Sequence, residues 1–184
     1  MTLIEDHQIN TITYLHLMKI LCIPGSTRPQ SSNIRLLEAL SSLNTEHHFY
    51  IYKEISKLPL FTAGLKNQDF EQVIDLQRKV SEADGLIFCT PEYLHNLPAC
   101  IKNLLEWLTE SGEVHKKKTL ALTFCPNPPR GEKAMQSLLW SLKALDANVL
   151  ASLPLFQNEL KFEEQGDIAP CESKALLKAA LDLF

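Results

Sequence analysis

The fold is decided by the stretch KILCIPGSTRPQSSN, residues 19–33. An apolar strand at residues 19–23 runs into a hydroxyl-rich turn, and an amphipathic helix begins directly after that turn. In α/β proteins this order places an anion at the helix N-terminus, because the first N–H groups lack intrahelical acceptors and the helix dipole favours negative charge there. The side chains that can donate to such an anion are Ser26, Arg28, Ser31 and Ser32.

Two common phosphate-binding loops are excluded by the same stretch. A P-loop requires a second glycine followed by lysine, where this chain has Gln30 and Ser31. A dinucleotide fingerprint requires three glycines, and this loop has only Gly25. A turn built from side-chain donors suits a terminal monophosphate, such as that of FMN. The alternative is that Ser31, Ser32 and Asn33 only cap the helix.

Composition is that of an ordinary globular protein. The chain has 184 residues, 45% hydrophobic and 22% charged, which favours one domain with a large core. A net charge of −4 disfavours nucleic acid or an anionic membrane as partner. The five cysteines form no Cys-x-x-Cys pair and no metal-ligand spacing, so we expect no metal and a reducing, cytoplasmic location. We expect no transmembrane segment and no signal peptide.

Apolar strands and amphipathic helices alternate along residues 18–184, and residues 1–17 are interpreted as an N-terminal extension. Strands are predicted at residues 19–23, 49–52, 86–89, 119–125 and 149–155. Helices are predicted at residues 34–43, 70–83, 98–110, 133–144 and 172–182. This alternation predicts a flavodoxin-like three-layer α/β fold whose five-stranded parallel sheet has the order 2-1-3-4-5. A ligand would lie between strands one and three, at loops 25–33 and 90–97, flanked by loop 125–131.

The second of these loops carries a family resemblance. It reads TPEYLHNLP, residues 90–98, and continues with Lys102, Asn103 and Trp107. Together with the Gly-Ser-Thr-Arg-x-x-Ser-x-Asn turn at residues 25–33, it resembles the NADPH-dependent FMN reductase family. That family includes quinone, azo-compound and chromate reductases, and the resemblance is good over residues 18–131.

The resemblance implies an oxidoreductase that uses FMN, takes electrons from NADPH or NADH, and passes them to a quinone or similar small acceptor. It implies a phosphate and ribityl site made of Ser26, Arg28, Ser31, Ser32 and Asn33. It implies a flavin-ring site made of Pro91, Glu92, Tyr93, Leu94 and His95. A flavin brings its own redox chemistry, so no acid–base pair is required. His95 is a candidate proton donor to a reduced quinone, with a plain loop histidine as the alternative.

Two departures from the family pattern stand out. Many relatives have Asn where this chain has Leu94, which is expected to alter an interaction near the ring. The third loop, CPNPPRG at residues 125–131, is bulky where relatives are often rich in Ser and Gly. Two alternative functions therefore stay open: a flavodoxin-type electron carrier, and a flavin-free binding or regulatory domain.

The apolar pattern of the helix at residues 98–110 indicates a subunit interface. Its apolar arc is wider than the ~100° stripe that packs on one sheet. Trp107 and Cys100 lie at one border of that arc, where a sheet contact alone would leave them partly exposed. We therefore predict a homodimer, or a tetramer, through this helix, as the family resemblance also implies. The alternative is that the fourth helix or the N-terminal extension covers Trp107 within one chain.

Overall fold

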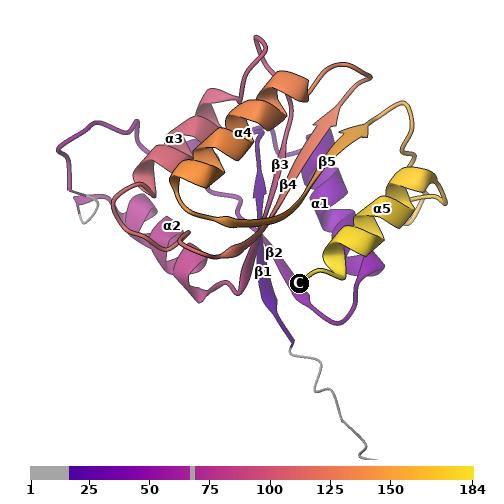
Figure 1. Ribbon diagram of the computed structural model, residues 1–184, viewed down its shortest axis with the longest axis horizontal. Coiled ribbons are helices and arrows are strands. Elements are labelled where there is room, and N and C mark those ends of the chain that lie inside the picture. Colours follow the sequence, from indigo (N-terminus) through magenta and orange to yellow (C-terminus); the bar gives the residue numbers. More distant parts are fainter. Residues whose placement is uncertain (1–16, 67–68) are drawn as a thin grey trace, which may run out of the picture.

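The computed structural model describes residues 17–66 and 69–184, and its elements alternate as the sequence predicts (Figure 1). The predicted extension at residues 1–17 falls almost wholly outside this range and stays a prediction. The elements are β1 (Lys19–Pro24), α1 (Ser32–Leu43), β2 (His48–Ile51), the 3₁₀ helix η1 (Ile55–Lys57), α2 (Glu71–Glu82), β3 (Gly85–Thr90), α3 (Ala99–Trp107), β4 (Lys118–Cys125), α4 (Glu132–Ala144), β5 (Asn148–Phe156) and α5 (Glu172–Leu181).

The strands form one parallel sheet with the order β2-β1-β3-β4-β5, which confirms the predicted topology. The central strand β3 is buried along its whole length, as expected for a continuous apolar run with helices on both faces. The chain switches direction between β1 and β3, so the loops that follow these two strands leave the same edge of the sheet side by side.

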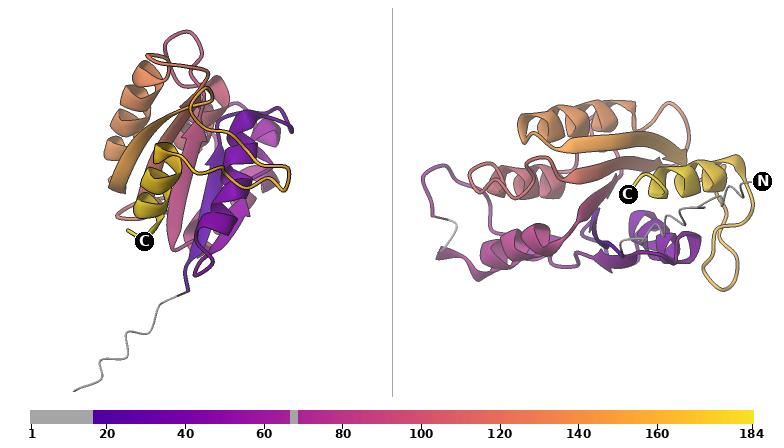
Figure 2. Two further views of the ribbon diagram at one scale, coloured as in Figure 1. Left: turned by 90° about the vertical axis from the view of Figure 1, so that its right-hand side faces the viewer. Right: turned by 60° about the horizontal axis from the view of Figure 1, so that its bottom comes forward.

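Helices cover both faces of the sheet (Figure 2). Alternate side chains of β1 point to opposite faces: Ile20 and Cys22 pack with α1 and α5, whereas Leu21 and Ile23 pack with α2, α3 and α4. Hydrophobic cores on the two sides of the sheet therefore hold the three layers together.

The ends of β1 and β3 approach each other unusually closely. The Gly25 N–H donates to the Cys89 carbonyl at 2.7 Å. A Cβ atom built on Gly25 would lie 2.3 Å from the Thr90 hydroxyl oxygen, a distance that van der Waals repulsion forbids. Glycine is required at this position because any side chain would push the two loops apart.

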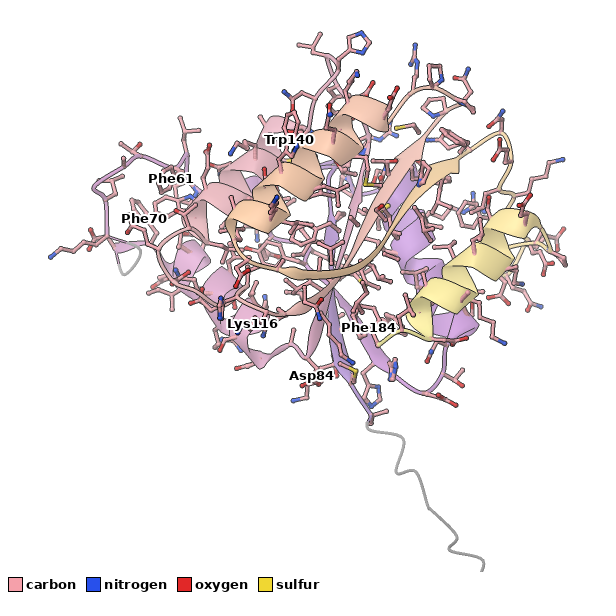
Figure 3. All side chains as sticks on the ribbon, in the orientation of Figure 1. Phe61, Phe70, Asp84, Lys116, Trp140 and Phe184 are labelled. Atoms are coloured by element: carbon pink, nitrogen blue, oxygen red, sulfur yellow. The ribbon has the colours of Figure 1, made fainter. Side chains whose placement is uncertain are left out.

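Trp107 is fully buried, which corrects the sequence-based expectation of a partly exposed border residue. Only 1% of its surface is exposed, and its indole N–H donates to the Pro59 carbonyl at 2.8 Å. The rings of Phe61 and Phe70 lie 5.2 and 5.4 Å from it, in the segment between η1 and α2 (Figure 3). Pro59, Phe61 and Phe70 thus contact Trp107 within one chain, so Trp107 gives no support to a dimer.

The predicted helix at residues 98–110 is shorter than expected. It ends at Trp107, because the Leu108 N–H turns to the Leu105 carbonyl and tightens the last turn. Within the described ranges, no helix is long and apolar enough to cross a membrane.

Candidate functional site

A groove of about 1270 Å³ lies across the carboxyl ends of β1, β3, β4 and β5. It occupies the place that the strand order predicts for a ligand. Of the predicted site residues, the groove is lined by Ser26, Arg28, Ser31, Ser32, Asn33, Pro91, Glu92 and Tyr93. Leu94 and His95 are not among its lining residues.

Three serine hydroxyls at the start of α1 are arranged as donors. The oxygens of Ser26, Ser31 and Ser32 each accept a hydrogen bond, from Arg28 N–H at 3.3 Å, Ile34 N–H at 3.2 Å and the Gln157 side-chain amide at 3.0 Å. A hydroxyl that accepts from an N–H still has its own proton to donate. Each of the three hydroxyls can therefore still donate to an acceptor in the groove.

Backbone groups and a guanidinium add to these donors. Within residues 17–66 and 69–184, the N–H groups of Ser32 and Asn33 have no protein acceptor, as is usual in a first helical turn. The Arg28 guanidinium forms no ion pair with a described carboxylate, although it borders the same groove. This concentration of donors at one helix N-terminus fits a phosphate group.

The alternative interpretation of this turn, that its polar side chains cap α1, holds for Ser31. Ser31 is the N-cap of α1. The Asn33 side chain is fixed below the groove: its amide N–H donates to the Phe124 carbonyl at 3.4 Å, and its oxygen accepts from the Cys89 thiol at 3.2 Å. Asn33 thus ties the start of α1 to β3 and β4. Capping by Ser31 does not exclude anion binding here, because capping uses the serine oxygen and leaves its proton free.

Glu92 caps a second helix that borders the groove. One carboxylate oxygen accepts from the N–H groups of Lys133 and Ala134, at 2.9 and 3.1 Å, at the start of α4. The N-cap position of α4 is Gly131, which has no side chain to fill this role. The N-terminus of α4 is therefore already neutralised by a carboxylate, whereas that of α1 faces the groove.

Residues 93–96 form a tight hairpin turn at the rim of the groove. Tyr93 and Asn96 exchange backbone hydrogen bonds of 3.1 and 2.9 Å, and both residues between them have positive φ angles, 50° for Leu94 and 56° for His95. This is the geometry of a type I′ turn, which favours Asn and Gly. Leu94 is 99% exposed, so its departure from the family pattern places a strained leucine in solvent.

The imidazole of His95 lies at the outside of the same turn. Its side chain is 87% exposed, and its Nδ1 atom is 3.5 Å from the second oxygen of Glu92.

The third loop supplies Cys125, Pro126 and Arg130 to the wall of the groove. Burial raises the pKa of the Cys125 thiol above its ordinary value, so this cysteine is a neutral, apolar part of the wall. No group of three His, Cys, Asp or Glu side chains in the described residues is placed to hold a metal ion.

Sequence reasoning missed several lining residues at the carboxyl end of β5 and beyond, among them Gln157, Phe162 and Asp167. Gln157 directly follows β5, a position at which the strand order alone indicates the ligand side of the sheet. Phe162 and Asp167 lie in a connection whose path the sequence pattern does not define.

Known proteins are similar to this chain in sequence and in fold. The chain is 28% identical over 173 residues to 2-hydroxy-1,4-benzoquinone reductase from Burkholderia sp., covering 91% of this chain and 94% of that protein. It is 28% identical to NADPH:quinone oxidoreductase from Arabidopsis thaliana, covering 90% and 89% of the two chains. The structure of FerB, a flavoenzyme NAD(P)H:(acceptor) oxidoreductase from Paracoccus denitrificans, superimposes with a TM-score of 0.75 at 20% identity, covering 90% and 94%.

The fold and the groove define a flavodoxin-like protein with a candidate anion site at the first βα turn. Residues 18–159 match the family described as NADPH-dependent FMN reductase. The chain belongs to that family, as its sequence resemblance predicted. It is accordingly an oxidoreductase of the NAD(P)H-dependent, FMN-using type, which favours this function over the carrier and flavin-free alternatives.

Leu94→Asn is expected to stabilise the protein by about 1 kcal/mol, because Asn tolerates positive φ far better than leucine does. Urea denaturation of the variant and the wild type measures the change. Leu60→Asn is the control, since Leu60 is also highly exposed but does not have a positive φ angle. An equal effect of both substitutions would mean that exposure, not backbone conformation, governs the change.

Proposed function

We propose that this protein transfers electrons from NADPH or NADH, through FMN held in the groove, to a quinone or a similar small acceptor. The observation that carries the proposal is the set of three serine hydroxyls, each with its oxygen occupied and its proton free, at the open N-terminus of α1. Relatives that match over most of the chain are named as quinone reductases, which supports a quinone as acceptor.

The phosphate end of the ligand is assigned to the first turn of α1. Ser26, Ser31 and Ser32 donate hydroxyl hydrogen bonds, the free N–H groups of the first helical turn donate from the backbone, and Arg28 adds a charge-assisted bond. Asn33 acts from below by holding the helix start against β3 and β4. Of the five residues predicted to bind the phosphate end, four are thus assigned as direct donors, and Asn33 is assigned to position them.

The ring end is assigned to residues 91–93. Bound FMN supplies the redox chemistry, since its ring accepts hydride and returns electrons. Pro91 and Tyr93 offer apolar surface to a flat ring, and Glu92 fixes this loop against α4. We assign no proton transfer to His95, because its imidazole does not belong to the groove wall.

Anaerobic spectroscopy tests the proposed reaction. Addition of NADPH to the FMN-loaded protein without oxygen should bleach the flavin absorbance, and subsequent addition of a benzoquinone should restore it. NADH is the parallel electron donor. Reduction by neither nucleotide would overturn the reductase proposal and favour an electron carrier, whereas reduction without reoxidation by the quinone would overturn the assigned acceptor.

Arg28→Ala should weaken FMN binding by roughly 1.5–3 kcal/mol, the contribution of a hydrogen bond to a charged group. Calorimetric titration of the flavin-free protein measures this loss. Riboflavin lacks the phosphate, so its affinity should be lower than that of FMN and unaffected by the substitution. Arg78→Ala, on the exposed side of α2, is the control for loss of an arginine. Equal affinity for FMN and riboflavin in the wild type would refute the phosphate site.

We further propose a cytoplasmic location and a homodimer. The cysteines are all free and three of them are buried, which fits a reducing compartment. The proposed dimer interface uses the outer face of α3 and α4, which cover the same side of the sheet (Figure 1). Trp140 of α4 is 65% exposed on this face (Figure 3), and large exposed aromatic side chains are enriched at subunit interfaces.

Trp140→Glu should dissociate this dimer, because a carboxylate would be buried without a partner in the interface. Sedimentation at micromolar concentration measures the state of assembly. Leu176→Glu is the matched control, since Leu176 is an exposed residue of α5 on the opposite face of the sheet. A monomeric wild type, or a dimer that survives Trp140→Glu, would contradict the proposed interface.

A further inference from the structure

Gln157 joins two parts of the groove that are far apart in the sequence. Its side-chain amide N–H donates to the hydroxyl oxygen of Ser32, 125 residues earlier in the chain, at 3.0 Å. Gln157 directly follows β5, Ser32 begins α1, and both residues line the groove. The end of β5 is thereby tied to the start of α1, at the place assigned to the flavin phosphate.

The third loop holds the backbone of Gln157 in place. The Gln157 N–H donates to the Cys125 carbonyl at 2.9 Å, and the Asn158 N–H donates to the Pro126 carbonyl at 3.2 Å. These bonds continue the pairing of β4 with β5 beyond the end of β5. The loop whose sequence departs from the family pattern therefore fixes the position from which the Gln157 side chain reaches Ser32.

The direction of the bond between Gln157 and Ser32 decides what the serine hydroxyl can do. An amide N–H that donates to the hydroxyl oxygen leaves the hydroxyl proton for a ligand. A carboxylate at the same position has only acceptor oxygens, so it would take that proton and place a negative charge beside the phosphate. An amide at residue 157 is therefore compatible with an anion at Ser32, whereas a carboxylate is not.

This bond lies at the surface, so its contribution to folding is small. Gln157 is exposed and Ser32 is half-buried, and water can replace either partner. A ligand in the groove displaces that water, and a hydrogen bond is electrostatically stronger in drier surroundings. Gln157 is accordingly expected to affect the affinity for a ligand and not the stability of the free protein.

We propose that Gln157 is a positioning residue for the flavin phosphate: its amide holds the Ser32 hydroxyl so that the proton is donated to the phosphate, which favours FMN over riboflavin. The inference rests on the proposed function, because it requires a phosphate at the N-terminus of α1. Ser32 makes the contact with the phosphate, and Gln157 acts through Ser32.

Calorimetric titration of the flavin-free protein with FMN and with riboflavin tests the proposal. Gln157→Met removes the amide and should weaken FMN binding about fivefold, the usual effect of one neutral hydrogen bond. Gln157→Glu should weaken it about thirtyfold or more near neutral pH, because the carboxylate also repels the phosphate. Riboflavin affinity and the melting temperature of the flavin-free protein should change little. Gln165→Glu is the matched control, since Gln165 is another exposed residue of the groove wall, and it should weaken FMN less than about threefold.

Two further measurements separate positioning from a general structural defect. Lowering the pH from about 8 to about 5 should bring the FMN affinity of Gln157→Glu closer to that of the wild type at the same pH, because a phosphate raises the pKa of a neighbouring carboxyl and the protonated carboxyl can donate to Ser32. Ser32→Ala removes the hydroxyl through which Gln157 acts, so Gln157→Met should have no further effect in that background.

The outcomes distinguish this inference from the proposed function. Equal losses of FMN and riboflavin affinity in Gln157→Met, a loss in Gln165→Glu as large as in Gln157→Glu, or an undiminished effect of Gln157→Met in the Ser32→Ala background would each overturn the positioning role. Full retention of FMN affinity by both Gln157 variants would overturn it too, and in all these cases the flavin site itself stands. If the wild type binds no FMN, both proposals fail.

Discussion

The close contact between Gly25 and Thr90 is the constraint on which the groove depends. Gly25 directly follows β1 and Thr90 ends β3, at the point where the chain reverses its direction across the sheet, and the Gly25 N–H bonds directly to the Cys89 carbonyl. Since no Cβ atom fits between them, the two loops leave the sheet as close neighbours. The Asn33 amide then adds β4 to this junction by bonding to the Phe124 carbonyl. Three loops from distant parts of the sequence are thus held at one edge.

Helix dipoles give the groove its polarity. The N-termini of α1 and α4 both border it, and each would attract an anion. The Glu92 carboxylate already bonds to two N–H groups at the start of α4, whereas the cap of α1 is a neutral serine. The free N–H groups of α1 are therefore open to a phosphate, whereas those at the start of α4 are already bonded to a carboxylate. This asymmetry orients a ligand that has an anionic end and a flat, nearly neutral end.

Most of the fold followed from the sequence because its signals are local. The apolar run of β3, the amphipathic spacing of α1 and the single glycine at the β1 turn each depend on a few neighbouring residues, and the strand order is the common one for five alternating strands and helices. Long-range contacts were the ones that sequence reasoning missed. The cover over Trp107 comes from Pro59, Phe61 and Phe70, and the cap of α4 comes from a glutamate about forty residues earlier in the chain. No periodicity encodes such contacts, although the absence of a capping side chain at Gly131 is a hint that another residue fills the role.

The turn after Tyr93 shows how local strain is held in place by these long-range contacts. Two consecutive non-glycine residues with positive φ cost on the order of 1–2 kcal/mol each, so an isolated peptide of this sequence would not keep the turn. On one side the loop is anchored by the bonds from Glu92 to α4, and on the other by the side chain of Leu97, which is buried in the core just before α3 begins. The strain is thereby confined to the exposed tip, while Pro91 and Tyr93 keep fixed positions on the groove wall. The conformation of the tip is thus a consequence of the anchors, and the groove wall depends on the anchors and not on the identity of residue 94.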